Sequence, residues 1–496
     1  MSHRRKSSSL TAARRARELR ELAETPVDVL VVGLGVTGAG AALDAASRGL
    51  SVAAIDAHDL AFGTSRWSSK LVHGGLRYLA HGDVGIAYES AVERGALMRT
   101  IAPHLVRPLP SILPAASVVR RSAVARARAG FFAGDLLRLA ARTPRGVLPA
   151  PRRLSTVEAH SMAPALRREG LRGGLLSWDG QLCDDARLVV GLARAAAGHG
   201  ARILTRCRAV SSSGLVDELT GSSFSVQARV VINATGVWAR TLAPSLPLRP
   251  SLGSHLILPG SILNGLCAGL TIPVPGSSSR YVMALPQHDG RVYVGLTDEP
   301  FDGPIPDVPT VPGADVDFLL GVLNSVLEQP VSPSDVIGSY AGLRPLLSAE
   351  GATADISRRH VVQVGEDGVV TVVGGKLTTY RRMAQDAVDA AVRSSGLTAG
   401  PCVTTRLPLP GAGPGASGPR RLVARYGTEA LAVHALGSEQ VAPGVTFGEL
   451  RWGVLHEGAL DESDLLDRRT RAGLVPADRS SALDAARQAL LRTQGA

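Results

Sequence analysis

The chain has 496 residues, of which 45% are apolar, so it can bury the cores of two or three globular domains. Its four cysteines (Cys183, Cys207, Cys267 and Cys402) are far apart and form no CxxC pair, which argues against a disulfide framework or a zinc site. We therefore expect a reducing compartment and no bound metal. The formal charge of +11 fits a solvated basic surface, an anionic substrate, an anionic membrane surface or nucleic acid, and composition does not choose among them.

The first 26 residues are rich in arginine and lack the apolar core of a signal peptide. We predict that residues 1–26 form a basic leader that is mobile or lies on the surface. A second unusual stretch, Pro250–Ser279, contains no Asp, Glu, Lys or Arg. Prolines and glycines interrupt it, so it predicts strands and turns, and no transmembrane segment is expected.

Regular structure is predicted to begin with an apolar, β-branched strand at Val27–Gly33. A helix over residues 38–48 follows, and Ser51–Asp56 is a second buried strand. Strand, glycine turn, helix and strand make a βαβ unit, in which the two strands are parallel and the crossover is right-handed.

The glycine turn of this unit has the GxGxxG spacing of dinucleotide-binding proteins. Gly33 permits the tight turn, Gly35 the close approach of a pyrophosphate, and Gly38 the packing of helix against sheet. The helix start offers free N–H groups to phosphates. Asp56 ends the second strand, where a carboxylate accepts hydrogen bonds from a ribose. The unit predicts a dinucleotide site that includes Val36 and Thr37, and FAD and NAD share this fingerprint.

Later buried strands at Arg229–Gly236 and Gly368–Gly375 have the same character but lie far along the chain. The nucleotide-binding domain is therefore predicted to be discontinuous, with a domain of short antiparallel strands inserted into it. A linker rich in Pro and Gly precedes helical patterns near the end, which predict a small all-α domain. The predicted ranges are 27–105, 180–250 and 340–400 for the nucleotide-binding domain, 106–179 and 251–339 for the substrate and membrane-facing domain, and 411–496 for the C-terminal domain.

Several motifs occur in one order along the chain. GTSRWSSKLVHGGLRYL spans residues 63–79, and WDGQLCDDARL, NATGVWA, GSHLILP, GRVYVGLTDEP, AGLRPL, GGKLTTYRRMA and DLLDRRTR follow it. In this order they resemble the FAD-dependent, quinone-linked glycerol-3-phosphate dehydrogenases of the D-amino-acid-oxidase-like flavoproteins. The resemblance implies an α/β fold: a Rossmann-like FAD-binding domain of the glutathione-reductase type, an inserted antiparallel-sheet substrate domain and a small helical cap. It also implies FAD as the cofactor.

The resemblance extends the predicted FAD site beyond the glycine turn. A dense set of donors after the second strand suits a pyrophosphate and a flavin edge, and a second helix start near Gly375 is expected to face the flavin N1–C2=O edge. The predicted cofactor residues in these segments are Thr64, Ser65, Ser69, Lys70, Gly74, Gly75, Val210, Gly236, Gly375, Lys376, Leu377 and Thr378.

The implied substrate is glycerol 3-phosphate, which carries a phosphate dianion and a secondary alcohol. Arg77, Arg344, Arg358 and Lys376 stand in the matching motifs as candidate cations, and Tyr78 as a further donor. By resemblance, Arg344 lies near the reacting C2 oxygen, whereas Arg77 and Arg358 hold the phosphate. Any one arginine in so basic a chain is more often a solvated surface group.

His255, in GSHLIL, is the candidate general base, because a neutral imidazole is an available proton acceptor near pH 7. The alternative is a buried, hydrogen-bonded histidine in a strand. Lys376 or Arg344 are the other candidates for handling the hydroxyl proton. Thr297 and Asp298 either shape the pocket or form a structural turn. The expected reaction is hydride transfer from C2 to flavin N5, giving dihydroxyacetone phosphate.

Residues 118–145 combine seven arginines with several phenylalanines and leucines. If helical, this segment either lies in a membrane interface or packs as an ordinary surface helix. We expect a peripheral protein on the cytoplasmic face of the cell membrane that passes electrons to a quinone. The alternatives are a glycerol-3-phosphate oxidase that reduces O2 to H2O2, or another oxidase of the same fold. No zinc spacing or recognition-helix pattern supports nucleic-acid binding. The sequence does not distinguish a homodimer from a monomer.

Overall fold

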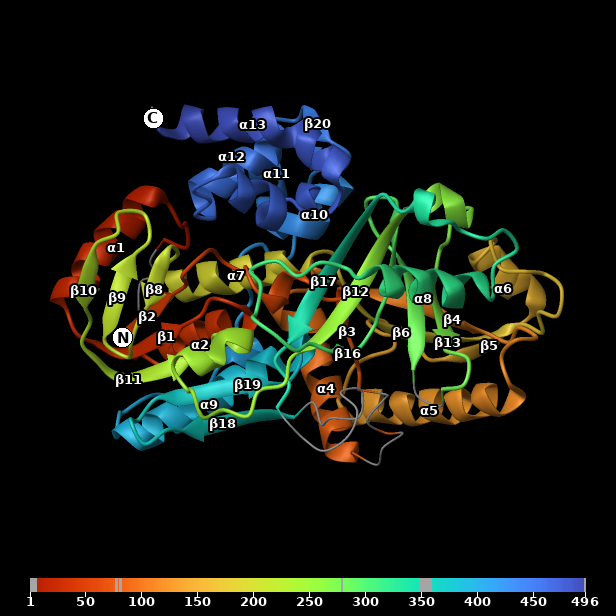
Figure 1. Ribbon diagram of the computed structural model, residues 1–496, viewed down its shortest axis with the longest axis horizontal. Helices are drawn as coiled ribbons and strands as arrows, with labels where there is room; N and C mark the ends of the chain where they lie inside the picture. Colours follow the sequence, from red (N-terminus) through yellow and green to blue (C-terminus); the bar gives the residue numbers. More distant parts are fainter. Residues whose placement is uncertain (1–6, 76–78, 80–82, 278–279, 348–358, 495–496) are drawn as a thin grey trace.

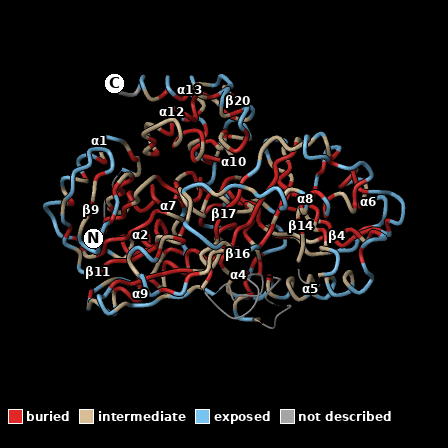
Figure 2. The backbone as a smooth tube through the Cα atoms, viewed as in Figure 1, coloured by how far each residue is buried: buried red, intermediate tan, exposed pale blue. Residues whose placement is uncertain are grey.

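The computed structural model describes residues 7–75, 79, 83–277, 280–347 and 359–494, and it contains two large β-sheets joined side by side (Figure 1). The α/β fold predicted from the sequence is confirmed. Buried residues concentrate along both sheets and the helices that cover them (Figure 2). No helix in the described ranges is long and apolar enough to cross a membrane.

The first sheet has six strands in the order β18-β19-β11-β1-β2-β7. Its neighbours are parallel except for β18, which runs antiparallel to β19 at the edge. The central pairing joins Val29 to Val230 on one side and to Val52 on the other. The strands are β1 Val27–Val32, β2 Val52–Ile55, β7 Arg202–Leu204, β11 Ala228–Asn233, β18 His360–Val364 and β19 Val370–Gly374.

Alternate strand residues of this sheet fill two cores, one on each face. Val29 and Val31 face helices α2 (Val36–Ser47), α7 (Asp185–Gly198) and α9 (Tyr380–Ser395). Leu30 and Val32 face the other side, which is covered by helix α1 and the three-stranded sheet of β8 Cys207–Ala209, β9 Gly214–Asp217 and β10 Ser223–Ser225. The continuous apolar character of β1 follows from this burial on both faces.

Helix α1 (Ala12–Glu24) lies on the surface, which was one of the two alternatives predicted for the leader, but it is an ordered helix and not a mobile segment. Arg15 is buried, donates to the Thr205 carbonyl and pairs with Asp217 at 2.5 Å. Leu22 is buried beneath the sheet. The helix is arginine-rich in sequence, yet Arg15 and Leu22, on one face, anchor it to the nucleotide-binding sheet.

The second sheet is mostly antiparallel and has the order β16-β12-β15-β14-β13-β4-β6-β3, with β17 paired to β12 and β5 to β6. Helices α6 (Thr156–Met162) and α8 (Gly313–Asn324) belong to its core, and α5 (Arg121–Ala140) lies along its lower edge (Figure 1). The strands are β3 Leu71–Val72, β4 Val106–Pro114, β5 Arg152–Leu154, β6 Gly174–Leu182, β12 Ser251–Pro259, β13 Gly269–Pro273, β14 Tyr281–Pro286, β15 Arg291–Gly295, β16 Glu299–Pro300 and β17 Gly338–Arg344.

Two of these strands fall inside ranges predicted for the nucleotide-binding domain. β3 lies within 27–105 and pairs with β6, and most of β17 lies within 340–400 and pairs with β12 over seven residues. Both therefore belong to the second sheet. They carry the chain across the junction between the sheets, where the candidate site lies.

The region after residue 419 is the cap seen at the top of Figure 1. It is helical as predicted, with α10 Arg420–Tyr426, α11 Ala430–Ala435, α12 Phe447–His456 and α13 Pro476–Gln494, but it also contains a small hairpin of β20 Gln440–Ala442 and β21 Val445–Thr446. Buried ion pairs dock it on α7, namely Arg187 with Glu457 and Arg194 with Glu429, both at 2.7 Å.

Candidate active site

A large cavity lies at the junction of the two sheets. Its walls come from the glycine turn after β1, the segment after β2, strands β12 and β17, and the segment after β19. Most predicted site residues line it: Gly33, Gly35, Val36, Thr37, Asp56, Thr64, Ser65, Ser69, Gly236, His255, Arg344, Gly375, Lys376, Leu377 and Thr378.

The glycine turn has the geometry that a pyrophosphate needs. Gly33 has a φ of +100°, and a Cβ there would lie 2.6 Å from the Ala234 carbonyl oxygen, so only glycine fits. Gly38 has no contact with the cavity; a Cβ there would meet the Gly33 carbonyl at 1.8 Å, so it serves the helix packing expected of it. Helix α2 starts at the cavity, and its Val36 N–H donates to Ser65 Oγ at 2.9 Å.

Asp56 ends β2 at the same end of the cavity. Its carboxylate accepts from the backbone N–H groups of Leu34 (2.7 Å) and His58 (2.9 Å). Burial raises the pKa of Asp56 to about 6, although the two backbone donors act in the opposite direction. A ribose hydroxyl would add a donor to this carboxylate, which fits the role predicted for it.

His255 lies at the other end, in β12, with only 2% of its surface exposed. Its Nε2 shares a hydrogen bond with Ser69 Oγ at 2.8 Å, and its ring stacks on Tyr340 with centroids 4.7 Å apart. Gly295 lets the ring approach the strand, since a Cβ there would lie 2.2 Å from His255 Cδ2. Burial, with the nearby Lys70 and Arg344 cations, lowers the pKa of His255 well below 6.5, so the ring is neutral at pH 7.

Arg344 ends β17 and lies flat against β12. Its guanidinium donates to Asp298 (3.1 Å), Ser251 Oγ (3.2 Å) and the Thr297 carbonyl (3.1 Å). Gly253 makes room for it, because a Cβ there would lie 2.1 Å from Arg344 Nη2. The guanidinium is therefore fixed in one orientation at the cavity wall.

Lys376 and the residues after it form another part of the cavity wall. Lys376 Nζ donates to Ser90 Oγ at 3.2 Å. Gly375 has a φ of +72°, and Thr378 Oγ1 accepts from the His73 N–H at 3.0 Å. The short helix that begins at Leu377 continues into α9, so a helix start faces the cavity here as well.

Five further predicted residues do not line the cavity. Lys70 is fully buried and pairs with Asp185 at 2.7 Å, and Thr297 is buried with its hydroxyl donated to Asp315. Gly74 and Gly75 leave space for Arg94 and for helix α4 (Val84–Ala96). Val210 is exposed, whereas its neighbour Ala209 lines the cavity. Lys70 and Thr297 therefore lie behind the cavity wall. Arg77, Tyr78 and Arg358 lie outside the described residues.

The cavity also has aromatic walls that sequence reasoning missed. Phe62 stacks on His58 with ring centroids 3.9 Å apart, and Trp238 lies beside Phe62 at 6.5 Å. Gly63 permits this, since a Cβ there would lie 2.8 Å from the Trp238 ring. Trp238 stands in the NATGVWA motif, so the motif pointed to it, whereas His58 and Phe62 carry no signal beyond following Asp56.

The model of the family "FAD dependent oxidoreductase" (DAO) matches residues 28–381.

The chain belongs to this family of FAD-dependent oxidoreductases.

Glycerol-3-phosphate dehydrogenase 1 of Mycobacterium tuberculosis is 52% identical over 98% of the chain and 99% of its own length. The mitochondrial glycerol-3-phosphate dehydrogenase SDP6 of Arabidopsis thaliana is 34% identical over 88% of the chain and 70% of its length. The crystal structure of the Bacillus halodurans glycerol-3-phosphate dehydrogenase complexed with FAD covers 97% of the chain and is itself covered to 92%, with a TM-score of 0.75 and 27% identity.

FAD is thus the cofactor of this oxidoreductase, and the cavity fits it. Gly33, Gly35, Val36 and Thr37 line the cavity at the start of α2, where a helix start can bind a pyrophosphate, and Asp56 has the carboxylate for a ribose. The second helix start provides a positive dipole end for a ring system that gains negative charge on reduction, and the aromatic wall provides a flat apolar surface beside Asp56.

Proposed function

We propose that this flavoprotein oxidises sn-glycerol 3-phosphate to dihydroxyacetone phosphate and passes the electrons to a quinone at the inner face of the cell membrane. The observation that carries the proposal is the constellation at one end of the cavity. A neutral, buried His255 lies there beside the Arg344 cation, while the dinucleotide features occupy the other end, and Lys376 is a further cation in the wall of the same cavity. Relatives named glycerol-3-phosphate dehydrogenases support the choice of substrate.

Each of these residues would have its own role in the reaction. His255 Nε2 accepts the hydroxyl proton, in exchange for its hydrogen bond with Ser69 Oγ. Arg344, fixed by Asp298, stabilises negative charge on the C2 oxygen as that proton leaves. Lys376 adds a second positive charge at the cavity wall. When bound, FAD supplies the acceptor for the hydride from C2. Arg77, Arg358 and Tyr78 remain our candidates for the phosphate.

The substrate proposal is tested by adding glycerol 3-phosphate to the purified holoenzyme without oxygen. We expect the visible flavin bands to bleach in proportion to substrate, and glycerol to leave them unchanged because it lacks the phosphate. Persistence of the oxidised spectrum with excess glycerol 3-phosphate would exclude this substrate. Mixing the bleached enzyme with a soluble quinone or with O2 then separates a dehydrogenase from an oxidase. Rapid reoxidation by O2 with stoichiometric peroxide would refute the quinone assignment.

Helix α5 supports the membrane part of the proposal. Phe132, Leu136 and Leu139 are spaced i, i+4 and i+7 on one face, and each is more than half exposed. The opposite face, with Phe131 and Val124, packs on the core of the second sheet. Exposed arginines flank the apolar face at positions 120, 121, 126, 128, 142 and 145. An apolar stripe between basic side chains matches an anionic lipid surface.

Vesicle binding tests this docking face. We expect the Phe132→Ser, Leu136→Ser, Leu139→Ser triple variant to bind phosphatidylglycerol-containing vesicles at least about tenfold more weakly than wild type, because it loses the apolar area that would enter the interface. Leu491→Ser removes an equally exposed apolar side chain from α13 and serves as the control. Equal sedimentation of the triple variant and the control with vesicles would contradict the assignment.

A further inference from the structure

The C-terminal region does not line the cavity where the chemistry is proposed. In the part of the chain that the structure describes, no lining residue of the large cavity comes after Met383. The match to the oxidoreductase family likewise ends at residue 381. The region from Arg420 onward is therefore an addition to the catalytic core, and its DLLDRRTR motif (residues 464–471) has no role in the reaction as proposed so far.

The arginines of this motif nevertheless reach the loops behind the cavity wall. Arg469 and Asp59 are both fully buried, and the guanidinium forms a fork on the carboxylate with distances of 2.7 and 2.9 Å. Arg468 Nε donates to the same carboxylate at 2.5 Å, and its guanidinium lies 5.7 Å from the Phe62 ring. Asp59 is the middle of the segment after β2 that contributes Asp56 and Phe62 to the cavity.

Arg471 reaches a second buried carboxylate, that of Asp185 at the start of α7. Its Nη2 donates to Asp185 Oδ1 at 3.0 Å. The other oxygen of Asp185 accepts from Lys70 Nζ (2.7 Å) and from the backbone and side chain of Ser68 (3.0 and 2.7 Å). Asp185 thus joins the C-terminal region to the loop of residues 63–70, whose Ser69 holds His255.

The backbone conformation of Arg471 and Lys70 also indicates that surrounding contacts hold these residues in place. Arg471 has a φ of +70° and Lys70 a φ of +59°, in the left-handed region that side chains other than glycine rarely adopt. Such residues persist where surrounding contacts fix them, and they cluster at functional sites. Here both are donors to one carboxylate.

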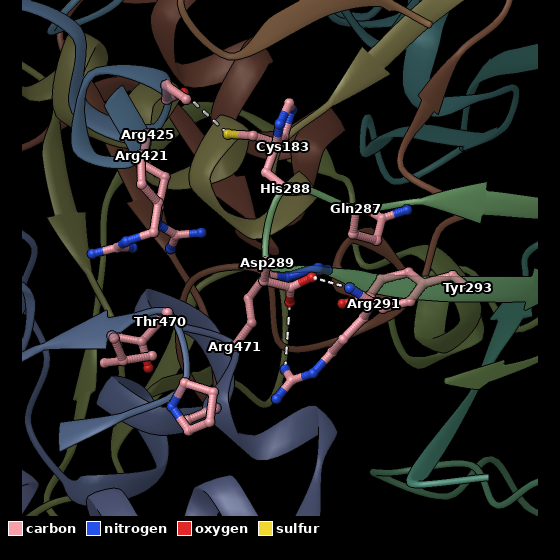
Figure 3. A pocket seen from close by; sticks show the side chains of 15 residues that line it. Cys183, Gln287, His288, Asp289, Arg291, Tyr293, Arg421, Arg425, Thr470 and Arg471 are labelled. Atoms are coloured by element: carbon pink, nitrogen blue, oxygen red, sulfur yellow. Dashed lines mark hydrogen bonds and ion pairs between the residues drawn. The ribbon is translucent and has the colours of Figure 1, made fainter. Parts of the chain in front are cut away.

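Arginines also line a second, smaller cavity beneath the cap. Arg421, Arg425 and Arg471 are among its lining residues (Figure 3). Arg421 pairs with Glu449, and Arg425 with Asp184 at 3.0 Å. Their charges are neutralised by buried carboxylates, so the arginines serve to hold elements of the protein together.

We infer that the DLLDRRTR segment is a positioning clamp: Arg468 and Arg469 fix the loop at the ribose end of the cavity through Asp59, and Arg471 fixes the loop that holds His255 through Asp185. The inference rests on the proposed function in assigning the two loops to the two ends of the bound cofactor and substrate. The two contacts should therefore have different effects: the Asp59 contact controls FAD retention, and the Asp185 contact controls turnover.

The competing explanation is that these arginines only dock the cap. The chain offers a matched control, because Arg194 and Glu429 form a two-pronged ion pair (both distances 2.7 Å) that docks the cap on α7 without touching either loop. Glu429→Gln should therefore lower the melting temperature while leaving FAD affinity and turnover unchanged.

The experiment compares Arg469→Gln, Arg471→Gln and Glu429→Gln in the full-length holoenzyme. We expect Arg469→Gln to raise the Kd for FAD at least about tenfold. We expect Arg471→Gln to keep FAD but to lower kcat roughly 100-fold with a smaller change in KM, because a shift of about 1 Å in His255 costs that much. The melting temperature of each holoenzyme is measured in parallel.

Two results would overturn the clamp. The first is wild-type FAD affinity in Arg469→Gln together with wild-type kcat in Arg471→Gln. The second is a loss of FAD affinity and of kcat in these variants that is no larger than the loss in Glu429→Gln. Should the glutamine variants not yield folded protein, Arg469→Lys and Arg471→Lys decide, since they keep the charge and lose the fork. Wild-type behaviour of both lysine variants would also overturn it. If the wild-type flavin fails to bleach with glycerol 3-phosphate, the substrate proposal falls, and FAD affinity still tests the clamp.

Discussion

Gly253 offers a direct test of the part proposed for Arg344. A Cβ at this position would lie 2.1 Å from Nη2 and 2.7 Å from Cζ of the Arg344 guanidinium. Ordinary van der Waals contact begins near 3.4 Å, so in Gly253→Ala the guanidinium must retreat by about 1 Å. It cannot do so freely, because Asp298, Ser251 and the Thr297 carbonyl hold it where it is.

A displacement of this size at a reacting centre lowers the rate about 100-fold, which corresponds to about 2.7 kcal/mol of transition-state stabilisation. We expect kcat/KM of Gly253→Ala to fall by that factor in a dye-coupled assay with glycerol 3-phosphate. The visible FAD spectrum should be retained, since Gly253 lies at the end of the cavity away from the glycine turn. Gly321→Ala on α8 is the control, because a Cβ there meets nothing within 4 Å.

The double variant decides whether the loss acts through Arg344. In an Arg344→Ala background the added methyl group has no guanidinium to displace, so Gly253→Ala should cost nothing further. If the two losses instead multiply, or if Gly253→Ala is as active as Gly321→Ala, the reasoning is refuted.

Two further predictions concern proton uptake. Burial raises the pKa of Asp56 to about 6, so FAD should bind more weakly below pH 6, where the carboxylate that we assign to the ribose is protonated. Asp56→Asn should remove this pH dependence in a fluorescence titration of FAD, and an unchanged profile would count against the contact. Burial lowers the pKa of His104 to about 4, below the ordinary 6.5 of the unfolded chain, so the unfolded state takes up the proton first and stability is lost as pH falls from 6.5 towards 4. In urea unfolding, the free energy of unfolding of His104→Gln should fall by about 2 kcal/mol less than that of wild type between pH 7 and pH 5. Equal decreases in the two proteins would exclude His104 as a source of this pH dependence.

The sequence predicted best those features in which neighbours along the chain determine the conformation. The turn at Gly33, its following helix and Asp56 lie within 24 residues, and their spacing alone predicts the dinucleotide end of the cavity. The strand at Ala228–Asn233 was likewise predictable, because burial on both faces requires the apolar run Val230–Ile232 at its centre.

Features that depend on distant partners were not predictable from local pattern. Lys70 has the position of a cofactor ligand in its motif, but its partner Asp185 is 115 residues away and draws the ammonium behind the wall. Arg15 was assigned to a basic leader because no residue near it in the sequence indicates its ion-pair partner, Asp217. The prediction placed residues 340–344 with the nucleotide-binding sheet, and only the pairing of β17 with β12 assigns them to the other one.

The strand order of the nucleotide-binding sheet also constrains how the chain can be made. β1 needs β11 beside it, and β11 needs β19, whose last residue is Gly374. The first strands to leave the ribosome must therefore wait for some 340 further residues before their sheet is complete. Throughout that interval their apolar edges remain open to other chains, so we expect stalled or truncated products ending before residue 370 to aggregate rather than to accumulate as smaller folded units.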